Sequence, residues 1–161
     1  ALTVRLWRSS RPIYARIAQS IQQDLASAGV TVDVVERDAA SARAAARNGE
    51  ADLFLTDWYG DYPDAENFTY PLLHSRNHGP GGNLAFLTDP ALDSLIVRAR
   101  STPDTAQKSR LMMEIDRRAF EMAPWIFFWF PVDLWAERPD VEGWKIPAVF
   151  NGQRWITARV K

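Results

Sequence analysis

Residues 2–37 read LTVRLWRSSRPIYARIAQSIQQDLASAGVTVDVVER, and this stretch decides the fold class. Its two ends, residues 2–6 and 30–35, alternate between apolar and polar side chains, which is the period of a half-buried strand. Between them, apolar residues recur at steps of three and four and therefore share one face of a helix, which Gly29 can end in a left-handed conformation. These residues are Tyr14, Ile17, Ala18, Ile21, Leu25 and Ala28. The stretch predicts a strand, a helix and a second strand.

The following segment continues the same order of elements. Residues 39–47 are rich in Ala and favour a helix that stops at Asn48 and Gly49, and the apolar run 53–55 predicts a third strand. Strands that alternate with helices at this spacing form a parallel sheet with right-handed crossovers. We therefore expect an α/β fold with a mainly parallel sheet flanked by helices.

The second half of the chain begins with a loop and continues with two helices. Residues 57–86 are rich in Gly, Pro, Asn, Asp and aromatic side chains, which indicates a long ordered loop with a single helical turn. Asp89 and Thr102 each precede a proline suited to the first position of a helix, so each is predicted to cap one. The apolar residues 125–130 follow Pro124 and predict a strand buried on both faces, with Trp125 and Trp129 in the core. Residues 155–158 predict a final strand.

Composition excludes several classes of protein. The chain has 161 residues, which suits one domain, and its 19 Lys and Arg balance 20 Asp and Glu, so no basic surface points to nucleic acid. The absence of Cys excludes disulfides, thiolate metal sites and a Cys nucleophile. The longest apolar run, residues 125–130, is too short to cross a bilayer. The sequence opens inside a strand, so we expect a secreted precursor to carry a leader before it.

A candidate site follows the third strand directly. Residues 57–64 read DWYGDYPD and combine carboxylates, aromatic rings and a glycine. Ligands of open α/β sheets bind outside the carboxyl ends of the strands, where this segment is expected to lie. A carboxylate held there can pair with an ammonium group of a ligand, and the rings can cover an apolar chain. The alternative is a solvated acidic surface loop.

Three other kinds of site are possible in residues 57–78. A hydrolase could use Asp57, Asp61, Asp64 or Glu66 as an acid/base pair, although the sequence has no nucleophile motif, no Gly-rich phosphate loop and no metal signature. A cation site in the acidic loop lacks the spacing of an EF-hand. Two histidines four residues apart lie among Gly and Pro rather than on a predicted helix, so they are expected to be ordinary loop residues and not metal ligands. These are His74 and His78.

Motifs along almost the whole chain resemble those of family 5 extracellular solute-binding proteins, the group that binds oligopeptides and dipeptides. Residues 52–68, DLFLTDWYGDYPDAENF, are similar to the family block W-x-x-D-Y-x-D/E-P-x-x-F. Other segments look like the family's L-x-x-x-G-I-x-V, N-P-x-x-D-x-L, D-x-x-x-R, A-P-x-I and V-x-G. In order, these are AGVTV at 28–32, DPALDSL at 89–95, DTAQKSRL at 104–111, APWI at 123–126 and VEGW at 141–144.

The resemblance implies a two-lobed clamshell, of which residues 1–138 are the carboxyl-terminal lobe and residues 139–161 a tail that returns toward the amino-terminal lobe. The ligand would be a peptide or a similar small solute, bound without a cofactor or metal and delivered to the membrane subunits of an ABC importer. The resemblance also implies a periplasmic or otherwise extracytoplasmic location, with a membrane-anchored lipoprotein as one form. A sensory domain of a regulator is the third reading, because some regulators carry a similar pair of lobes.

The resemblance also assigns roles to residues in the loop. By the match, Asp61 receives the α-ammonium group of a peptide. Trp58, Tyr59 and Gly60 lie along the ligand backbone and its first side chain, and Tyr62 completes the candidate set. The sequence departs from the family block at residue 65, where alanine replaces the usual proline, so the shape of the loop and the choice of a peptide as ligand stay open.

Overall fold

The computed structural model describes residues 2–132, 134, 136–144 and 157–161. Its sheet has three parallel strands, β1 (Leu2–Ser9), β2 (Val30–Arg37) and β3 (Leu53–Phe54), in the order β2-β1-β3. β1 pairs with β2 over eight residues and with β3 through Leu6 and Trp7. The predicted parallel sheet is therefore confirmed, with β1 in its centre.

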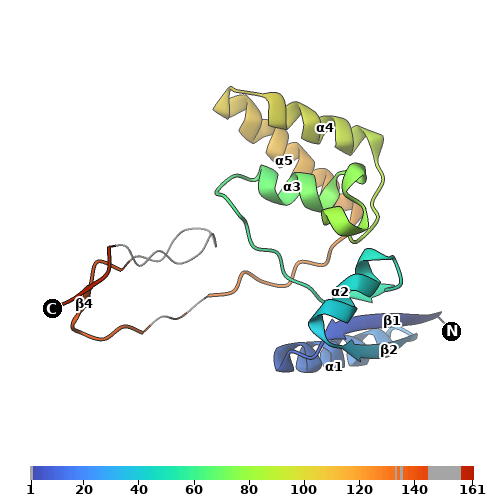
Figure 1. Ribbon diagram of the computed structural model, residues 1–161. Helices are drawn as coiled ribbons and strands as arrows, with labels where there is room; N and C mark the ends of the chain where they lie inside the picture. The colour runs from blue at the N-terminus through green and yellow to red at the C-terminus, as the bar shows by residue number, and fades with distance from the viewer. Residues whose placement is uncertain (1, 133, 135, 145–156) are drawn as a thin grey trace.

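Two helices flank this sheet. α1 (Pro12–Ser27) connects β1 to β2, and α2 (Ala39–Arg47) connects β2 to β3. Figure 1 shows them on opposite faces of the sheet, as right-handed crossovers in opposite directions require. Gly29 follows α1 with a φ of 80°, in the left-handed conformation that was predicted to end the helix. A cluster between α1 and the sheet forms one apolar core, whose buried members are Leu6, Ala18, Val32 and Leu55.

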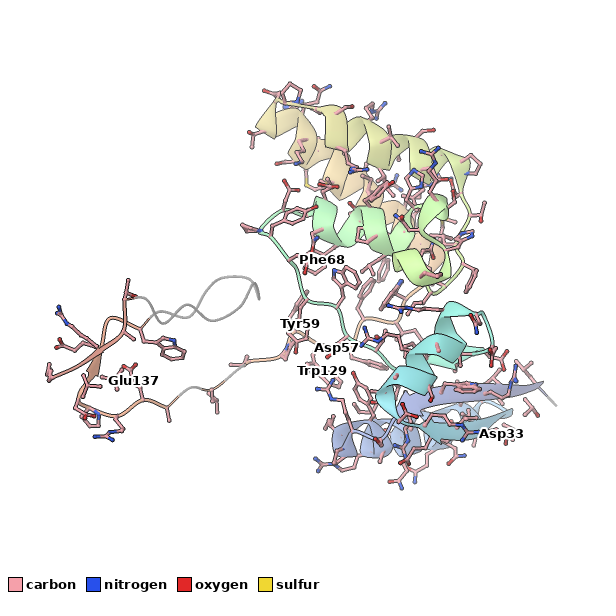
Figure 2. All side chains as sticks on the ribbon, in the orientation of Figure 1. Asp33, Asp57, Tyr59, Phe68, Trp129 and Glu137 are labelled. Carbon is pink, nitrogen blue, oxygen red and sulfur yellow. The ribbon has the colours of Figure 1, made fainter. Side chains whose placement is uncertain are left out.

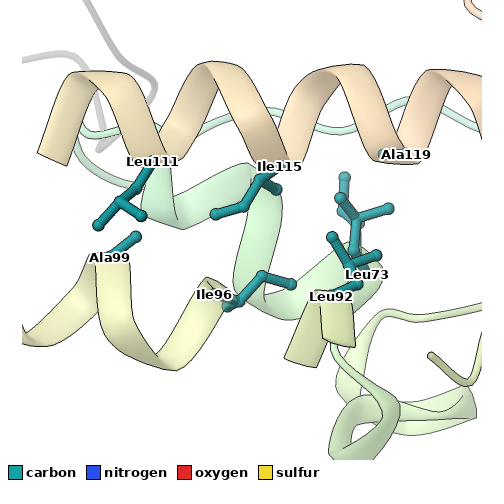
Figure 3. Close-up of a cluster of buried hydrophobic side chains, with 8 residues drawn as sticks. Leu73, Leu92, Ile96, Ala99, Leu111, Ile115 and Ala119 are labelled. Atoms are coloured by element: carbon teal, nitrogen blue, oxygen red, sulfur yellow. The ribbon is translucent and has the colours of Figure 1, made fainter. Parts of the chain in front are cut away.

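Three more helices form a second apolar core. They are α3 (Glu66–Leu73), α4 (Pro90–Ser101) and α5 (Thr105–Met122), and α4 packs along α5 (Figure 3). The apolar face of each helix points into the cluster and excludes water. The buried members are Leu72, Leu73, Leu92, Ile96, Ala99, Leu111, Ile115 and Ala119.

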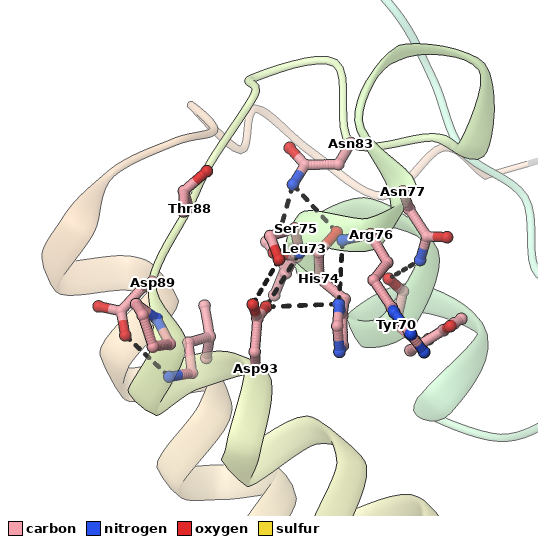
Figure 4. Close-up of polar contacts among 12 residues, drawn as sticks. Tyr70, Leu73, His74, Ser75, Arg76, Asn77, Asn83, Thr88, Asp89 and Asp93 are labelled. Carbon is pink, nitrogen blue, oxygen red and sulfur yellow. Dashed lines mark hydrogen bonds and ion pairs between the residues drawn. The ribbon is translucent and has the colours of Figure 1, made fainter.

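A polar network closes the end of this helical cluster, between α3 and α4 (Figure 4). Two short 3₁₀ helices, η1 (Ser75–Asn77) and η2 (Gly79–Gly81), lie there. The buried side chain of Asn83 donates to the carbonyl oxygens of Leu73 and His74, and Asp93 accepts the backbone N–H of Ser75 at 2.9 Å. The ring of His74 is buried and accepts the N–H of Arg76 through Nδ1. His74 therefore stabilises the turn between α3 and η1.

The prediction of a long loop with a single helical turn over residues 57–86 is wrong from Glu66 onward, because α3 and the two 3₁₀ helices lie there. The proline-rich and glycine-rich composition hid a helix that Leu72 and Leu73 anchor in the core. Thr102 was also wrongly assigned as a cap. α5 begins after Asp104, whose carboxylate accepts the N–H of Gln107 at 2.6 Å.

The predicted strand over residues 125–130 is wrong as well. These residues are not in a strand, and the side chain of Phe130 is 96% exposed. Figure 1 shows this segment leaving α5 and running away from the helices. Trp125 packs partly against the helical core as expected, but Trp129 is exposed. A strand needs a neighbour for its backbone groups, and no described residue pairs with this segment.

A small hairpin forms the last part of the described chain. β4 (Val141–Glu142) pairs antiparallel with β5 (Arg159–Val160). Of the strand predicted at residues 155–158, Trp155 and Ile156 lie outside the described residues. The prediction is wrong for Thr157 and Ala158, which precede β5 and are not in a strand. In the described part of the chain, no helix is both long and apolar enough to cross a membrane.

Candidate functional site

The candidate loop, residues 57–65, connects the end of β3 to the start of α3. It begins at the edge of the sheet where the parallel strands β1 and β3 both end. Figure 2 shows Asp57 and Tyr59 along this connection, with Phe68 at its far end in α3. The loop therefore lies at the edge where open α/β sheets place ligands, as the sequence predicted.

One residue holds the middle of the loop. The side chain of Asn67, which is buried, accepts the backbone N–H of Asp61 through Oδ1 at 2.8 Å. Its backbone carbonyl accepts the indole N–H of Trp58 at 2.9 Å. Sequence reasoning missed Asn67, although an Asn at the start of a helix often bonds to nearby backbone.

Gly60 is closely packed at the centre of the loop. A Cβ atom at this position would lie 3.2 Å from the ring of Phe68 and 3.4 Å from the carbonyl oxygen of Tyr62. The residue is buried, and the loop passes close to the Phe68 ring. A side chain here would require the Phe68 ring to shift by a few tenths of an ångström.

Three of the four carboxylates in and beside the loop are paired with cations. Each pair joins the loop region to a distant element. Asp57 binds Arg11 at 2.9 Å, Asp64 binds Lys108 at 2.6 Å, and Glu66 binds Arg100 at 2.7 Å. The carboxylate of Asp61 is exposed and has no ion-pair or hydrogen-bond partner among the described residues. Asp61 is thus the acidic group that a ligand can reach.

Two of the paired groups, Asp64 and Arg11, have shifted pKa values. The hydrogen bond from Lys108, supported by the N–H of Glu66, lowers the pKa of Asp64 below its ordinary value. The hydrogen bond to Asp57 raises the pKa of Arg11. Both effects favour the charged forms, so Asp64 stays ionised at neutral pH.

Aromatic residues precede and follow Asp61 in the loop. Trp58, Tyr59 and Tyr62 are exposed, and the hydroxyl of Tyr62 donates to Glu66 at 3.0 Å. Glu66 is in turn held by Arg100, whose guanidinium carbon lies 3.7 Å from the centre of the Tyr70 ring. The ring of Tyr62 is therefore oriented through a chain of contacts that ends in the helical core.

The aromatic side chains of the loop, Trp58, Tyr59 and Tyr62, are exposed among the described residues. Two shallow hollows lie over α4, one of them between Arg98, Glu114 and Arg118, and neither is lined by the loop. Among the described residues, no three His, Cys, Asp or Glu side chains gather in a way that could hold a metal ion. All five candidate residues, Trp58, Tyr59, Gly60, Asp61 and Tyr62, are consecutive residues of this loop.

Comparison with known proteins identifies relatives of the chain. A sequence model of the family described as bacterial extracellular solute-binding proteins, family 5 middle, matches residues 2–80. Di/tripeptide-binding protein 2 of Pseudomonas aeruginosa is 33% identical over 132 residues, which are 82% of this chain and 25% of that protein. Heme-binding protein A of Haemophilus influenzae is 31% identical over 137 residues, 85% of this chain and 25% of that protein. The chain therefore spans about a quarter of the length of these curated relatives.

A solved structure agrees with these matches over a longer stretch. The dipeptide-binding protein from Pseudoalteromonas sp. SM9913, solved in complex with Met-Leu, is 26% identical and superposes with a TM-score of 0.79. The superposition covers 100% of this chain and 32% of that protein. Family model, relatives and fold agree, and the chain belongs to the family 5 bacterial extracellular solute-binding proteins.

Proposed function

We propose that this chain is the carboxyl-terminal lobe of a two-lobed protein that captures peptides, or similar small solutes, and delivers them to an ABC importer. Residues 1–138 form the lobe in this proposal, and residues 139–161 return toward an amino-terminal lobe. The chain spans about a quarter of the curated relatives, which leaves room for such a lobe. The exposed side chains Trp58, Tyr59 and Tyr62 of the loop support a site that needs a second wall.

The observation that carries the proposal is the unpaired carboxylate of Asp61. Its neighbours Asp57, Asp64 and Glu66 are neutralised by cations of this chain. An unpaired carboxylate beside exposed rings suits a ligand that has an ammonium group next to an apolar side chain, because the carboxylate binds the charge and the rings cover the side chain. The free amino terminus of a peptide has this chemistry.

Peptides are the ligand class that the relatives favour. Two of the curated relatives are named for di- and tripeptides, and one solved structure that covers the whole chain holds Met-Leu. Other relatives are named for heme and glutathione, so the family accommodates several solutes. Ala65, which replaces the usual proline, lies in the loop that would distinguish among them.

Binding without turnover is supported by the charges of the loop. A carboxylate pair that acts as acid and base needs one carboxyl with a raised pKa, as in glycosidases. Here the hydrogen bond from Lys108 lowers the pKa of Asp64, and Asp57 is paired with Arg11. We therefore favour a non-enzymatic binding protein without a cofactor over a hydrolase that uses Asp57, Asp61 or Asp64.

The importer's membrane subunits are the partner that this function requires, and the site of action is outside the cytoplasm. The family's description as extracellular supports that location. A periplasmic protein and a lipoprotein anchored to the membrane both satisfy the proposal. The sensory domain of a regulator would lack the importer partner, and co-purification of the full-length protein with the membrane subunits distinguishes the two.

The test measures the preference of the full-length protein for a free amino terminus. Mass spectrometry of co-purified material identifies the natural solute, and calorimetry then compares Met-Leu with N-acetyl-Met-Leu. Asp61→Asn should weaken Met-Leu binding by about 2–5 kcal/mol, because it removes one partner of an ion pair that the second lobe would bury on closing. The control is Asp33→Asn, an exposed carboxylate on β2 away from the loop (Figure 2), which should leave affinity unchanged. Equal affinity for both peptides, or turnover of the peptide, would overturn the proposal.

A further inference from the structure

We propose that Asn67 is a positioning residue of the ligand loop, which sets the direction of the Asp61 carboxylate and of the Trp58 ring without touching the ligand. This inference rests on the proposed function, because it assumes that Asp61 and Trp58 contact the ligand. It adds a residue that lies outside the candidate set and is 6% exposed.

The geometry places three hydrogen bonds of the loop on this one residue. Oδ1 of Asn67 accepts the backbone N–H of Asp61 at 2.8 Å, and its carbonyl oxygen accepts the indole N–H of Trp58 at 2.9 Å. Its own N–H donates to the carbonyl of Asp64 at 3.0 Å. Residues 58, 61 and 64 are therefore tied to a point at the start of α3, and α3 is anchored in the helical core through Leu72 and Leu73.

The arrangement fixes Asp61 without using its carboxylate. A hydrogen bond to the side chain of Asp61 would restrain it but would also neutralise it or compete with a ligand. The bond from Asn67 instead holds the backbone N–H, which orients the Cα–Cβ bond and leaves both carboxylate oxygens unpaired. A loop already ordered in this way loses less conformational entropy when the ligand binds.

Trp58 is also held by a hydrogen bond to Asn67. The indole ring has a single polar hydrogen, and that hydrogen is bonded to the carbonyl of Asn67. The rest of the ring is apolar, and Trp58 is 36% exposed. Gly60 permits the turn between these two anchors, since any Cβ there would meet the ring of Phe68.

A purely structural role in starting α3 would use the side chain differently. A capping side chain accepts N–H groups from the first turn of its own helix. The side-chain oxygen of Asn67 accepts an N–H six residues earlier, in the loop, and the N-cap residue Ala65 has no side-chain cap. This oxygen therefore bonds to the loop and not to the first turn of α3.

The experiment compares the affinity of the full-length protein for Met-Leu with its affinity for N-acetyl-Met-Leu in three variants. Asn67→Ala should reduce the preference for the free amino terminus by about tenfold, since the carboxylate of Asp61 is present but no longer directed. Asn67→Asp keeps an oxygen acceptor in the same place and should retain the preference. Asn77→Ala is the matched control, because it removes one side-chain hydrogen bond, to the carbonyl of Tyr70, away from the loop. It should lower stability without changing the preference.

Hydrogen exchange gives a second measurement that needs no variant. The Asp61 amide should exchange slowly in the wild-type protein although the residue is exposed, and rapid exchange would show that the bond to Asn67 is not formed. An unchanged preference in Asn67→Ala, or a preference lost equally in Asn77→Ala, would also overturn the inference. A wild-type protein with no preference, or an Asp61→Asn variant that keeps it, would instead overturn the proposed function.

Discussion

The ion pair between Lys108 and Asp64 connects the candidate loop to α5, and its strength can be predicted from its surroundings. Nζ of Lys108 lies 2.6 Å from Oδ2 of Asp64, and the two side chains are 28% and 36% exposed. Water screens a pair at this exposure, so it is worth far less than a buried pair. We expect a coupling energy of about 1 kcal/mol, at the upper end of the range for exposed pairs.

A double-mutant cycle measures this energy. Lys108→Met, Asp64→Asn and the double variant are unfolded in urea at pH 7, and the coupling energy is the departure from additivity. Met keeps the apolar stem of the lysine and removes the charge. A second cycle, with Asp33→Asn in place of the Asp64 variant, should be additive because Asp33 lies on the outer strand β2. A coupling energy no larger than that of this second cycle would refute the reasoning.

The same pair predicts a dependence on pH with a definite sign. The hydrogen bond from Lys108 lowers the pKa of Asp64 in the folded state. A carboxyl with a lowered folded pKa stabilises the protein above its unfolded pKa, about 3.9, and this contribution is lost as the pH falls through the folded pKa. The coupling energy should therefore be constant from neutral pH down to about pH 5 and disappear in stronger acid. A loss that begins near neutral pH would point to another titrating group.

The core, the cap of α5 and the open loop give further tests. Ile115→Ala should cost about 2–5 kcal/mol in urea unfolding because it leaves a cavity in the helical core, whereas Met113→Ala, at a side chain that is 64% exposed, should cost less than about 0.5 kcal/mol. Asp104→Ala should lower the free energy of unfolding by about 1 kcal/mol, because it removes the cap of α5. Thr102→Ala should lower it by less, because the hydroxyl of Thr102 donates to the backbone carbonyl of Arg98 and does not cap α5. Equal losses would contradict the assignment of Asp104 as the cap. The 161-residue chain alone should bind Met-Leu more weakly than the full-length protein in calorimetry, and micromolar or tighter binding would place the whole site within this lobe.

The sheet could be predicted from the sequence because its signal is local. The alternation of Leu2, Val4 and Leu6 and the helical period that follows depend on residues close in the chain, and the parallel pairing follows from their order. α3 could not be predicted in the same way. Its stability comes from Leu72 and Leu73 packing against α4 and α5, about twenty to forty residues later, while its own sequence contains Pro71.

The site was predictable in position but not in detail. The end of β3 and the acidic aromatic segment both point to residues 57–64, where the loop is found. The ion-pair partners Arg11, Arg100 and Lys108 come from three separate helices or their flanks, and no local pattern connects them to the loop. Asn67 is hidden for a related reason, because its role depends on a turn that brings residues 58 and 61 back to the start of α3.

The segment after α5, which was predicted to be a buried strand, has an apolar sequence but exposed side chains. Its pattern indicates burial, yet its side chains are exposed. They are Ile126, Phe127, Phe128, Trp129, Phe130, Val132 and Leu134. A water-soluble protein rarely leaves so long an apolar run uncovered, so the pattern and the exposure agree only if other residues cover the segment. The solved relative extends well beyond the part that this chain matches, and the proposed amino-terminal lobe would supply such residues. The proposed amino-terminal lobe would therefore cover this segment, and a strand can form there only where a neighbouring strand satisfies its backbone groups.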